Sequence, residues 1–320
     1  MELNPELIKR LEALEKKYAS TGQDLVSYLD GLLYSDYLTY WDYVHVDTLL
    51  SLQNPRTSFP DEEIFIIYHQ ITELYFKLCM NEFAQLGNKE SPDSKFFLTR
   101  VGRINNYFEN LVRSFEIMVA GMEHDQFLKF RMSLLPASGF QSAQYRKIEI
   151  CSTDFIRLVS KDHREKYNSN STIREMFDVI YWKTGATELS SGKKTLTLQQ
   201  FEDKYSEELI KLAESKKTDN LWQIYKKLSP ADQEDPKVKG AMKLLDVNIN
   251  VNWPLSHYKS AVRYLQKDPE DIKATGGTNW QKYLPPRFQK RIFYPELFTE
   301  TELNDWGKNW IARELFGVNS

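Results

Sequence analysis

Apolar residues recur along this chain at helical spacing, in runs separated by short polar segments. The strongest run covers residues 61–86, where three carboxylates follow Pro60 and oppose the helix dipole favourably. One apolar stripe of this run consists of Ile64, Ile67, Ile71, Leu74 and Leu78. Aromatic rings widen the stripe beyond one face. A helix that is apolar on more than one side is buried, so we expect residues 61–86 near the centre of the fold.

The same spacing predicts further helices over 3–19, 96–122 and 141–160, and one that starts near Pro254. Residues 161–246 alternate polar loops with short charged helices, which predicts a peripheral elaboration. Glycine and proline number 13 and 12 among 320 residues, while aromatic residues reach 13%, so helices with ring-rich packing are favoured over turns and strands. We expect an all-α protein with a single large helical domain over 1–320.

Charge and hydropathy limit which binding partners and which compartment are expected. The formal net charge is -3, and this lack of basic excess disfavours nucleic acid or an anionic membrane as the main partner. The longest apolar runs, such as IFIIY, are too short to span a bilayer, and the charged N-terminal residues contain no apolar signal region. Cys79 and Cys151 lack CxxC spacing and fit a reducing compartment. A cytoplasmic protein is expected.

Tyrosines crowd the segment from Tyr28 to Tyr43, YLDGLLYSDYLTYWDY. So many rings are unusual on a plain solvent-facing surface. We therefore expect residues 1–55 to dock against the protein's own core or against a neighbouring subunit.

An arginine stands just before a small-residue turn in FLKFRMSLLPASGFQSAQYRKIE, residues 127–149. Phe127, Phe130 and Arg131 lie at i, i+3 and i+4 and share one side of a helix. The PASG turn follows, and Gly139 allows backbone to approach a ligand closely. The planar guanidinium matches a carboxylate at two points, so this pattern favours a carboxylate pocket. A surface ion pair is the alternative for Arg131 alone.

Imidazole chemistry is restricted to five histidines, of which His124 and His163 have charged, solvated surroundings. His69 lies inside the most apolar helix, where a core role is the ordinary expectation. His257 has the small neighbours Ser260 and Ala261 on its own face, which leaves flat space beside the imidazole.

A porphyrin needs such clearance, and neutral imidazole is a normal haem ligand. A structural role for His257 remains the alternative. Spacings of the type HxxE, HxH and ExxH are missing from the sequence, which disfavours a non-haem metal site, and a GxSxG serine nucleophile is missing too.

Five ordered segments of the chain resemble the tryptophan 2,3-dioxygenase family of haem enzymes. They span residues 38–278 and read LTYWDYVHVDTLLSLQNP, IFIIYHQITELYFKL, FRMSLLPASGFQSAQYRKIE, HYKSAVRYL and TGGT. The resemblance implies an all-helical homotetramer that contains haem b. It further implies that the enzyme uses O2 to open the indole pyrrole ring of L-tryptophan, giving N-formylkynurenine.

The resemblance also assigns roles around the haem. His257 matches the proximal iron ligand, Arg263 matches the arginine that follows it, and Ser138 matches a residue that lines the haem pocket. His69 matches the distal histidine that contacts the indole N–H, and Phe65 matches a distal-pocket phenylalanine.

Further roles concern the substrate. Arg131 matches the residue that holds the substrate carboxylate, and Thr275 matches a threonine near the substrate ammonium and carboxylate. Tyr40 and Tyr43 match tyrosines that reach the active site of an adjacent subunit. Phe127 stands on the substrate side where the family usually has a tyrosine, so one pocket hydroxyl is missing.

Other departures also fall on the substrate side. Thr278 and Asn279 replace the usual serine pair after TGG, and the loop between His257 and Thr275 is longer than the family pattern. These differences keep two alternatives open. One is a related haem oxygenase or peroxidase that acts on a substituted indole or a tyrosine-like ring, and the other is a catalytically silent helical ligand-binding protein.

Overall fold

A computed structural model describes residues 4–36, 38–89, 92–134, 139–168, 170–186, 193–265 and 290–307. The chain divides into two compact units, residues 1–54 and residues 55–320. Throughout these described ranges the regular structure is helical, and the β pairing is limited to isolated bridges, such as the one between Val159 and Ile180. The expectation of an all-α fold is confirmed for this part of the chain.

The first unit contains four helices: α1 (Pro5–Ala19), α2 (Leu25–Leu33), α3 (Tyr40–Val44) and α4 (Val46–Leu50). Side-chain caps begin the first three, since Asn4, Asp24 and Thr39 each accept a hydrogen bond from a first-turn N–H group. None of the four helices contains a buried residue. Their positions are therefore set by local capping rather than by a core of their own.

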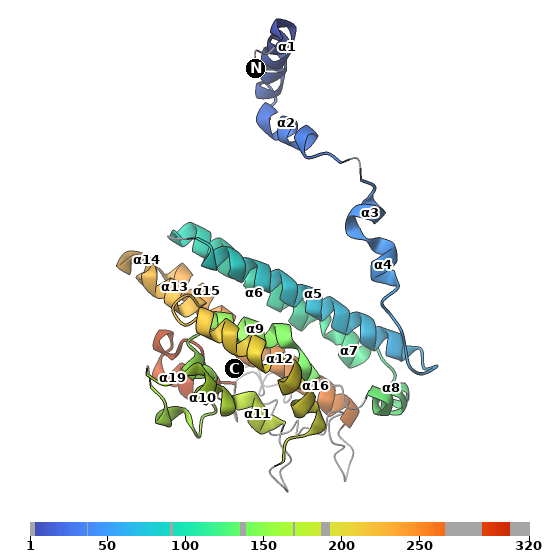
Figure 1. The fold of residues 1–320 in the computed structure, drawn as a ribbon, viewed down its shortest axis with the longest axis vertical. Helices are drawn as coiled ribbons and strands as arrows, with labels where there is room; N and C mark the ends of the chain where they lie inside the picture. The colour runs from blue at the N-terminus through green and yellow to red at the C-terminus, as the bar shows by residue number, and fades with distance from the viewer. Residues whose placement is uncertain are drawn as a thin grey trace. The chain divides into compact units, whose positions relative to one another are not determined.

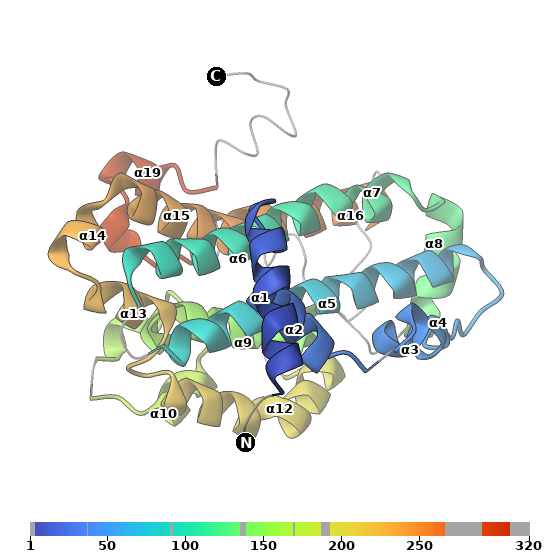
Figure 2. The ribbon, with the colours of Figure 1, turned by 90° about the horizontal axis from the view of Figure 1, so that it is seen from above.

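The second unit is built on two long helices, α5 (Asp61–Gly87) and α6 (Ser94–Ser114), which lie side by side (Figures 1 and 2). Against them pack α9 (Ala143–Ser152) and the run formed by α15 (Pro236–Val247), a π turn (Asn248–Asn252) and α16 (Trp253–Leu265). The short helices α7 (Glu116–Ala120) and α8 (His124–Phe130) close one end between α5 and α16. This end brings together the histidine-bearing helices.

The remaining helices pack around this frame. They are α10 (Ile173–Asp178), α11 (Tyr181–Gly185), α12 (Leu196–Ser215), α13 (Leu221–Lys227) and α14 (Pro230–Glu234), with α19 (Glu300–Asn304) near the end of the described chain. Among them, α12 and α13 pack against α9, α10 against α12, and α14 against α15. Residues 161–246 contribute fully buried side chains to the main core, among them Leu209, Val238 and Met242. None of the described helices combines the length and apolarity needed to cross a membrane.

The predicted bounds of α5 agree with the structure, but the predicted buried face was wrong. The buried positions are Tyr68, Thr72, Phe76, Cys79, Phe83 and Leu86, which repeat every three or four residues. Ile67, Leu74 and Leu78 of the predicted stripe are exposed in this chain. The face that carries the aromatic rings is the buried one, because each aromatic side chain buries more apolar area and α6 packs on that side.

Candidate active site

His257 lies on α16, one turn after the π turn. Its Nδ1 is 3.1 Å from the carbonyl oxygen of Trp253, and its ring lies 4.5 Å from the Trp253 ring and 4.6 Å from Phe115. Burial lowers its pKa to about 4. The imidazole is therefore neutral at ordinary pH. Because a carbonyl can only accept, Nδ1 carries the proton and Nε2 keeps its lone pair.

His69 lies on α5 with the same internal arrangement. Its Nδ1 is 2.7 Å from the carbonyl oxygen of Phe65, and the two rings are 4.1 Å apart. Burial lowers the pKa of His69, and His69 in turn contributes to lowering the pKa of His257. The site thus contains two neutral imidazoles within electrostatic reach of each other, each with a free Nε2 acceptor as far as the described residues extend.

Aromatic rings from three helices enclose this region. Phe65 of α5 lies 6.4 Å from Phe127 and 5.8 Å from Phe130, both on α8. Phe127 also lies 4.7 Å from Tyr264 of α16, whose hydroxyl donates to the carbonyls of Val119 and Met122. The structure therefore brings Phe65, His69 and Phe127 together, as expected, with a mostly apolar wall suited to a flat ring.

Arg131 follows α8 directly and begins a short 3-10 helix, Arg131–Leu134. Its relative exposure is 5%, and burial lowers the pKa of the guanidinium. A surface ion pair does not fit a side chain so enclosed. The cost of burying a positive charge is offset most effectively by an anionic partner, so the position suits recognition of a carboxylate.

The remaining expected site residues either lie outside the described part of the chain or are exposed. Ser138 and Thr275 lie outside the described residues. Arg263 is on α16 but is exposed, with its guanidinium carbon 5.8 Å from the Tyr264 ring. Tyr40 and Tyr43 belong to the first unit, where their side chains are 73% and 75% exposed.

Sequence reasoning missed several side chains that hold the histidines. Trp253 stands four residues before His257, and Tyr264 stands seven after it, so helical spacing could have found both. Phe115 could not be found that way, because its contact with His257 joins residues far apart in the chain.

The donor set fits a haem better than a bare metal ion. Among the residues that the structure describes, no group of three histidine, cysteine or carboxylate side chains could hold a metal ion. A haem requires only one axial side chain, since the porphyrin supplies the other nitrogen ligands. His257 could provide that single ligand, since it is a half-buried neutral imidazole oriented by a backbone carbonyl.

Known proteins of one family are similar to this chain. A family model described as Tryptophan 2,3-dioxygenase matches residues 31–229. The tryptophan 2,3-dioxygenase of Bacillus thuringiensis subsp. konkukian is 27% identical over 279 residues, which cover 83% of this chain and 92% of that protein.

Two further relatives match over shorter segments. The tryptophan 2,3-dioxygenase of Sorangium cellulosum is 39% identical over 124 residues, which cover 35% of this chain and 30% of that protein. The one from Polaromonas naphthalenivorans is 31% identical over 146 residues, which cover 45% and 51%. In these two relatives, the chain thus spans about half of their length or less. The family model covers more than half of this chain, which therefore belongs to the tryptophan 2,3-dioxygenase family.

Proposed function

We propose that this protein is a haem-dependent dioxygenase that uses O2 to open the indole pyrrole ring of L-tryptophan, giving N-formylkynurenine. The observation that carries the proposal is the pair of half-buried neutral imidazoles, His69 and His257, together with the buried guanidinium of Arg131 at the end of α8. Such a combination serves an oxidoreductase that must hold a cofactor, accept a proton or hydrogen bond, and orient an amino acid.

Haem b is the proposed cofactor, with Nε2 of His257 as its axial ligand. Bound haem supplies the redox chemistry that makes O2 reactive toward the indole. The Nδ1 hydrogen bond to Trp253 fixes the ring and its tautomer, which keeps the ligating lone pair on Nε2. Ser138 and Arg263 are proposed as further contacts of the haem.

The distal side is proposed to bind the substrate. The rings of Phe65 and Phe127 form apolar walls for the indole, and the Nε2 lone pair of His69 accepts a hydrogen bond from the indole N–H. Arg131 holds the carboxylate, with Thr275 near the ammonium and carboxylate. Fixing both ends of the amino acid reduces the entropy cost of bringing the indole to the reactive oxidant.

We further propose a homotetramer in which Tyr40 and Tyr43 reach the active site of an adjacent subunit. Two observations support assembly. The helices of residues 1–54 contain no buried residue, and α5 exposes an apolar row made of Ile67, Leu74 and Leu78. Extended apolar surface of this kind usually marks a protein interface. The two cysteines are free, which fits the proposed cytoplasmic location.

The test combines a spectrum with an assay. Purified protein reconstituted with haem should show a Soret band that shifts on reduction under carbon monoxide, and His257→Ala should abolish that band. His163→Ala is the control, because that histidine lies next to the short 3-10 helix Arg164–Lys166, outside the helices that form the site. Supplying L-tryptophan, O2 and a reductant should then produce the absorbance of N-formylkynurenine.

The outcomes separate the alternatives. A protein that binds haem through His257 but converts only substituted indoles or phenols would be the related oxygenase or peroxidase. Haem uptake without turnover of any indole would indicate the silent binding protein. Protein that stays colourless, or a Soret band unaffected by His257→Ala, would contradict the proposal.

Arg131→Lys tests the substrate side separately. An ammonium loses the two-point geometry, and hydrogen bonds to charged groups contribute about 1.5–3 kcal/mol, so the KM for tryptophan should rise by roughly tenfold or more. The Soret band should be unchanged. A KM equal to that of the unmodified protein would exclude carboxylate binding by Arg131.

A further inference from the structure

The sequence predicted that the helix carrying His257 begins near Pro254, but the helical structure begins well before that residue. Helical structure runs from Pro236 to Leu265 and is interrupted only by the π turn Asn248–Asn252. Within it, the N–H of Trp253 bonds to the carbonyl of Asn248, five residues back. In this register, the next donor, for the carbonyl of Ile249, would be residue 254. That residue is proline and has no N–H group.

Tyr145 of α9 supplies the missing donor. Its hydroxyl donates to the carbonyl of Ile249 at 2.8 Å, across a separation of 104 residues in the chain. The side chain is buried, and burial raises the pKa of its hydroxyl well above the ordinary value, so it stays a donor. A buried carbonyl without a partner would be costly. The bond therefore stabilises the π turn over an ordinary α-helical turn.

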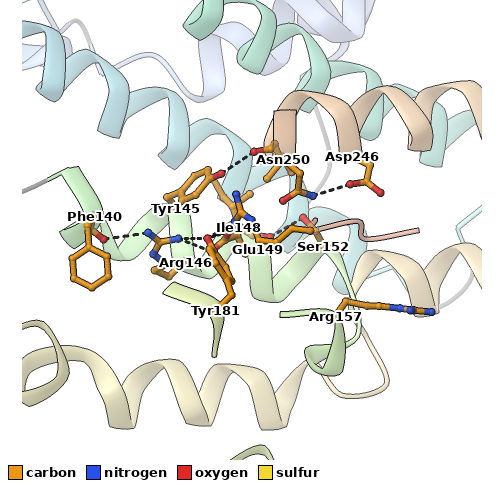
Figure 3. A network of polar contacts seen from close by, with 12 residues as sticks. Phe140, Tyr145, Arg146, Ile148, Glu149, Ser152, Arg157, Tyr181, Asp246 and Asn250 are labelled. Atoms are coloured by element: carbon orange, nitrogen blue, oxygen red, sulfur yellow. Dashed lines mark hydrogen bonds and ion pairs between the residues drawn. The ribbon is translucent and has the colours of Figure 1, made fainter. Parts of the chain in front are cut away.

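Buried polar side chains support the same turn. Asn250 donates to Asp246 at 2.7 Å, Asn252 donates to Asn248 at 2.8 Å, and Asn248 donates to Asn105 of α6 at 3.2 Å. Figure 3 shows Asp246 and Asn250 beside Tyr145, with the polar residues of α9 next to them. Polar groups this deep in a core are costly unless they are hydrogen-bonded, and the hydrogen bonds made here favour one specific arrangement of the turn.

The π turn decides which way His257 faces. It contains one more residue than an α-helical turn, and each residue of a helix turns the face by about 100°. If the turn relaxed to α geometry, His257 would leave the side of α16 that faces Phe115. Tyr145 also supports the site from a second direction, because Phe76 lies 5.6 Å from Tyr145 and 5.8 Å from Trp253.

We infer that Tyr145 is a positioning residue for His257: its hydroxyl replaces the N–H that Pro254 lacks, and so holds the π turn that aims the imidazole. This inference rests on the proposed role of His257 as the haem ligand. The inference concerns how the His257 imidazole is oriented, whereas the proposed function concerns whether this imidazole binds haem at all.

Tyr145→Phe is the test, because it removes the hydroxyl and keeps the ring contacts with Phe76 and with Arg146. Tyr294→Phe is the matched control. Tyr294 is equally buried, and its hydroxyl donates to the backbone carbonyl of Ser152 at 2.9 Å, outside the π turn. Both variants lose one buried tyrosine–carbonyl hydrogen bond, and Tyr145→Phe also loses the contact of its hydroxyl with Arg291, so the stability of both variants toward urea is measured alongside.

Two measurements then distinguish positioning from stability. In reduced, haem-loaded protein, Tyr145→Phe should shift or broaden the iron–histidine stretching band in the resonance Raman spectrum, while Tyr294→Phe leaves it unchanged. In haem-free protein, amide hydrogen exchange over residues 249–257 should be about fivefold faster in Tyr145→Phe than in Tyr294→Phe, as expected for one lost hydrogen bond.

Each result has a definite meaning. An iron–histidine band and exchange rates identical in the two variants would overturn the inference and leave the proposed function intact. The proposed function itself requires that His257→Ala abolishes the Soret band. If the unmodified protein binds no haem, the proposed function fails, and the exchange experiment still decides whether Tyr145 holds the π turn.

Discussion

Replacing Glu149 by glutamine should destabilise the fold severely, because this carboxylate neutralises two buried arginines. Glu149 is 1% exposed and accepts hydrogen bonds from Arg146 at 2.9 Å, from Tyr181 at 2.5 Å and from Arg291 (Figure 3). Glutamine has nearly the same shape but no charge. Glu149→Gln would leave two guanidiniums in the core without a counter-charge.

The magnitude follows from burial. Removing one partner of a buried ion pair costs about 3–5 kcal/mol, because the remaining charge stays desolvated. The matched control is Glu207→Gln, which breaks a two-point contact with Arg174 at 2.8 and 2.9 Å. That pair has good geometry, but its carboxylate is 65% exposed. Water can replace the lost contact, so no measurable change is expected.

Urea unfolding followed by tryptophan fluorescence provides the assay, with the free energy of unfolding as the quantity compared. Wild-type protein and the Glu207→Gln variant should unfold at the same urea concentration, and Glu149→Gln at a much lower one. If Glu149→Gln fell within about 1 kcal/mol of wild type, the two arginines would not depend on this carboxylate, and the reasoning from burial would be refuted.

Three further predictions concern pH and assembly. Burial lowers the pKa of the metal-free His257 imidazole to about 4, and a bound iron would compete with the proton; acid titration of the Soret band should therefore show haem retained down to about pH 4, and loss centred near the ordinary histidine pKa would contradict this. Burial raises the pKa of Asp246 from 3.8 to about 7, so between these pH values the folded state holds a proton that the unfolded chain releases, and stability should fall as the pH rises toward 7; Asp246→Asn should remove that dependence in unfolding experiments over this pH interval. Leu74→Asp combined with Leu78→Asp should reduce the mass measured by light scattering, whereas Leu244→Asp, at a separately exposed leucine on α15, should not.

Helix bounds were predictable where capping and spacing agree. The α5 helix begins at Asp61 as predicted and ends at Gly87, one residue beyond the predicted limit, because the proline and acidic first turn specify its start. Spacing could not choose between its two apolar faces, since that choice depends on which neighbour packs there. Residues 161–246 were underestimated because charged residues on the outer face of α12 conceal a buried row that includes Leu198, Phe201 and Leu209.

The site was predictable only in its local parts. Phe127 and Arg131 share a helical side within five residues, and His257 has its small neighbours one turn away, so short-range spacing was sufficient. The contacts that orient these residues are long-range. Tyr145 meets Ile249 across 104 residues, and Thr153 reaches Phe293 across 140. Contacts of this kind depend on the packing of whole helices, which periodicity along the chain does not specify.

The position of α9 suggests how substrate choice and cofactor binding can vary separately. Two of its buried polar residues contact the π turn and the C-terminal segment: Tyr145 donates to Ile249, and Glu149 accepts from Arg291. The wall formed by Phe127 lies on the other side of the site, against Phe65 and Tyr264. A substitution such as phenylalanine for tyrosine at position 127 changes the polarity of that wall without touching the hydrogen bonds that aim His257. The substrate side can therefore change while the histidine helix keeps its geometry.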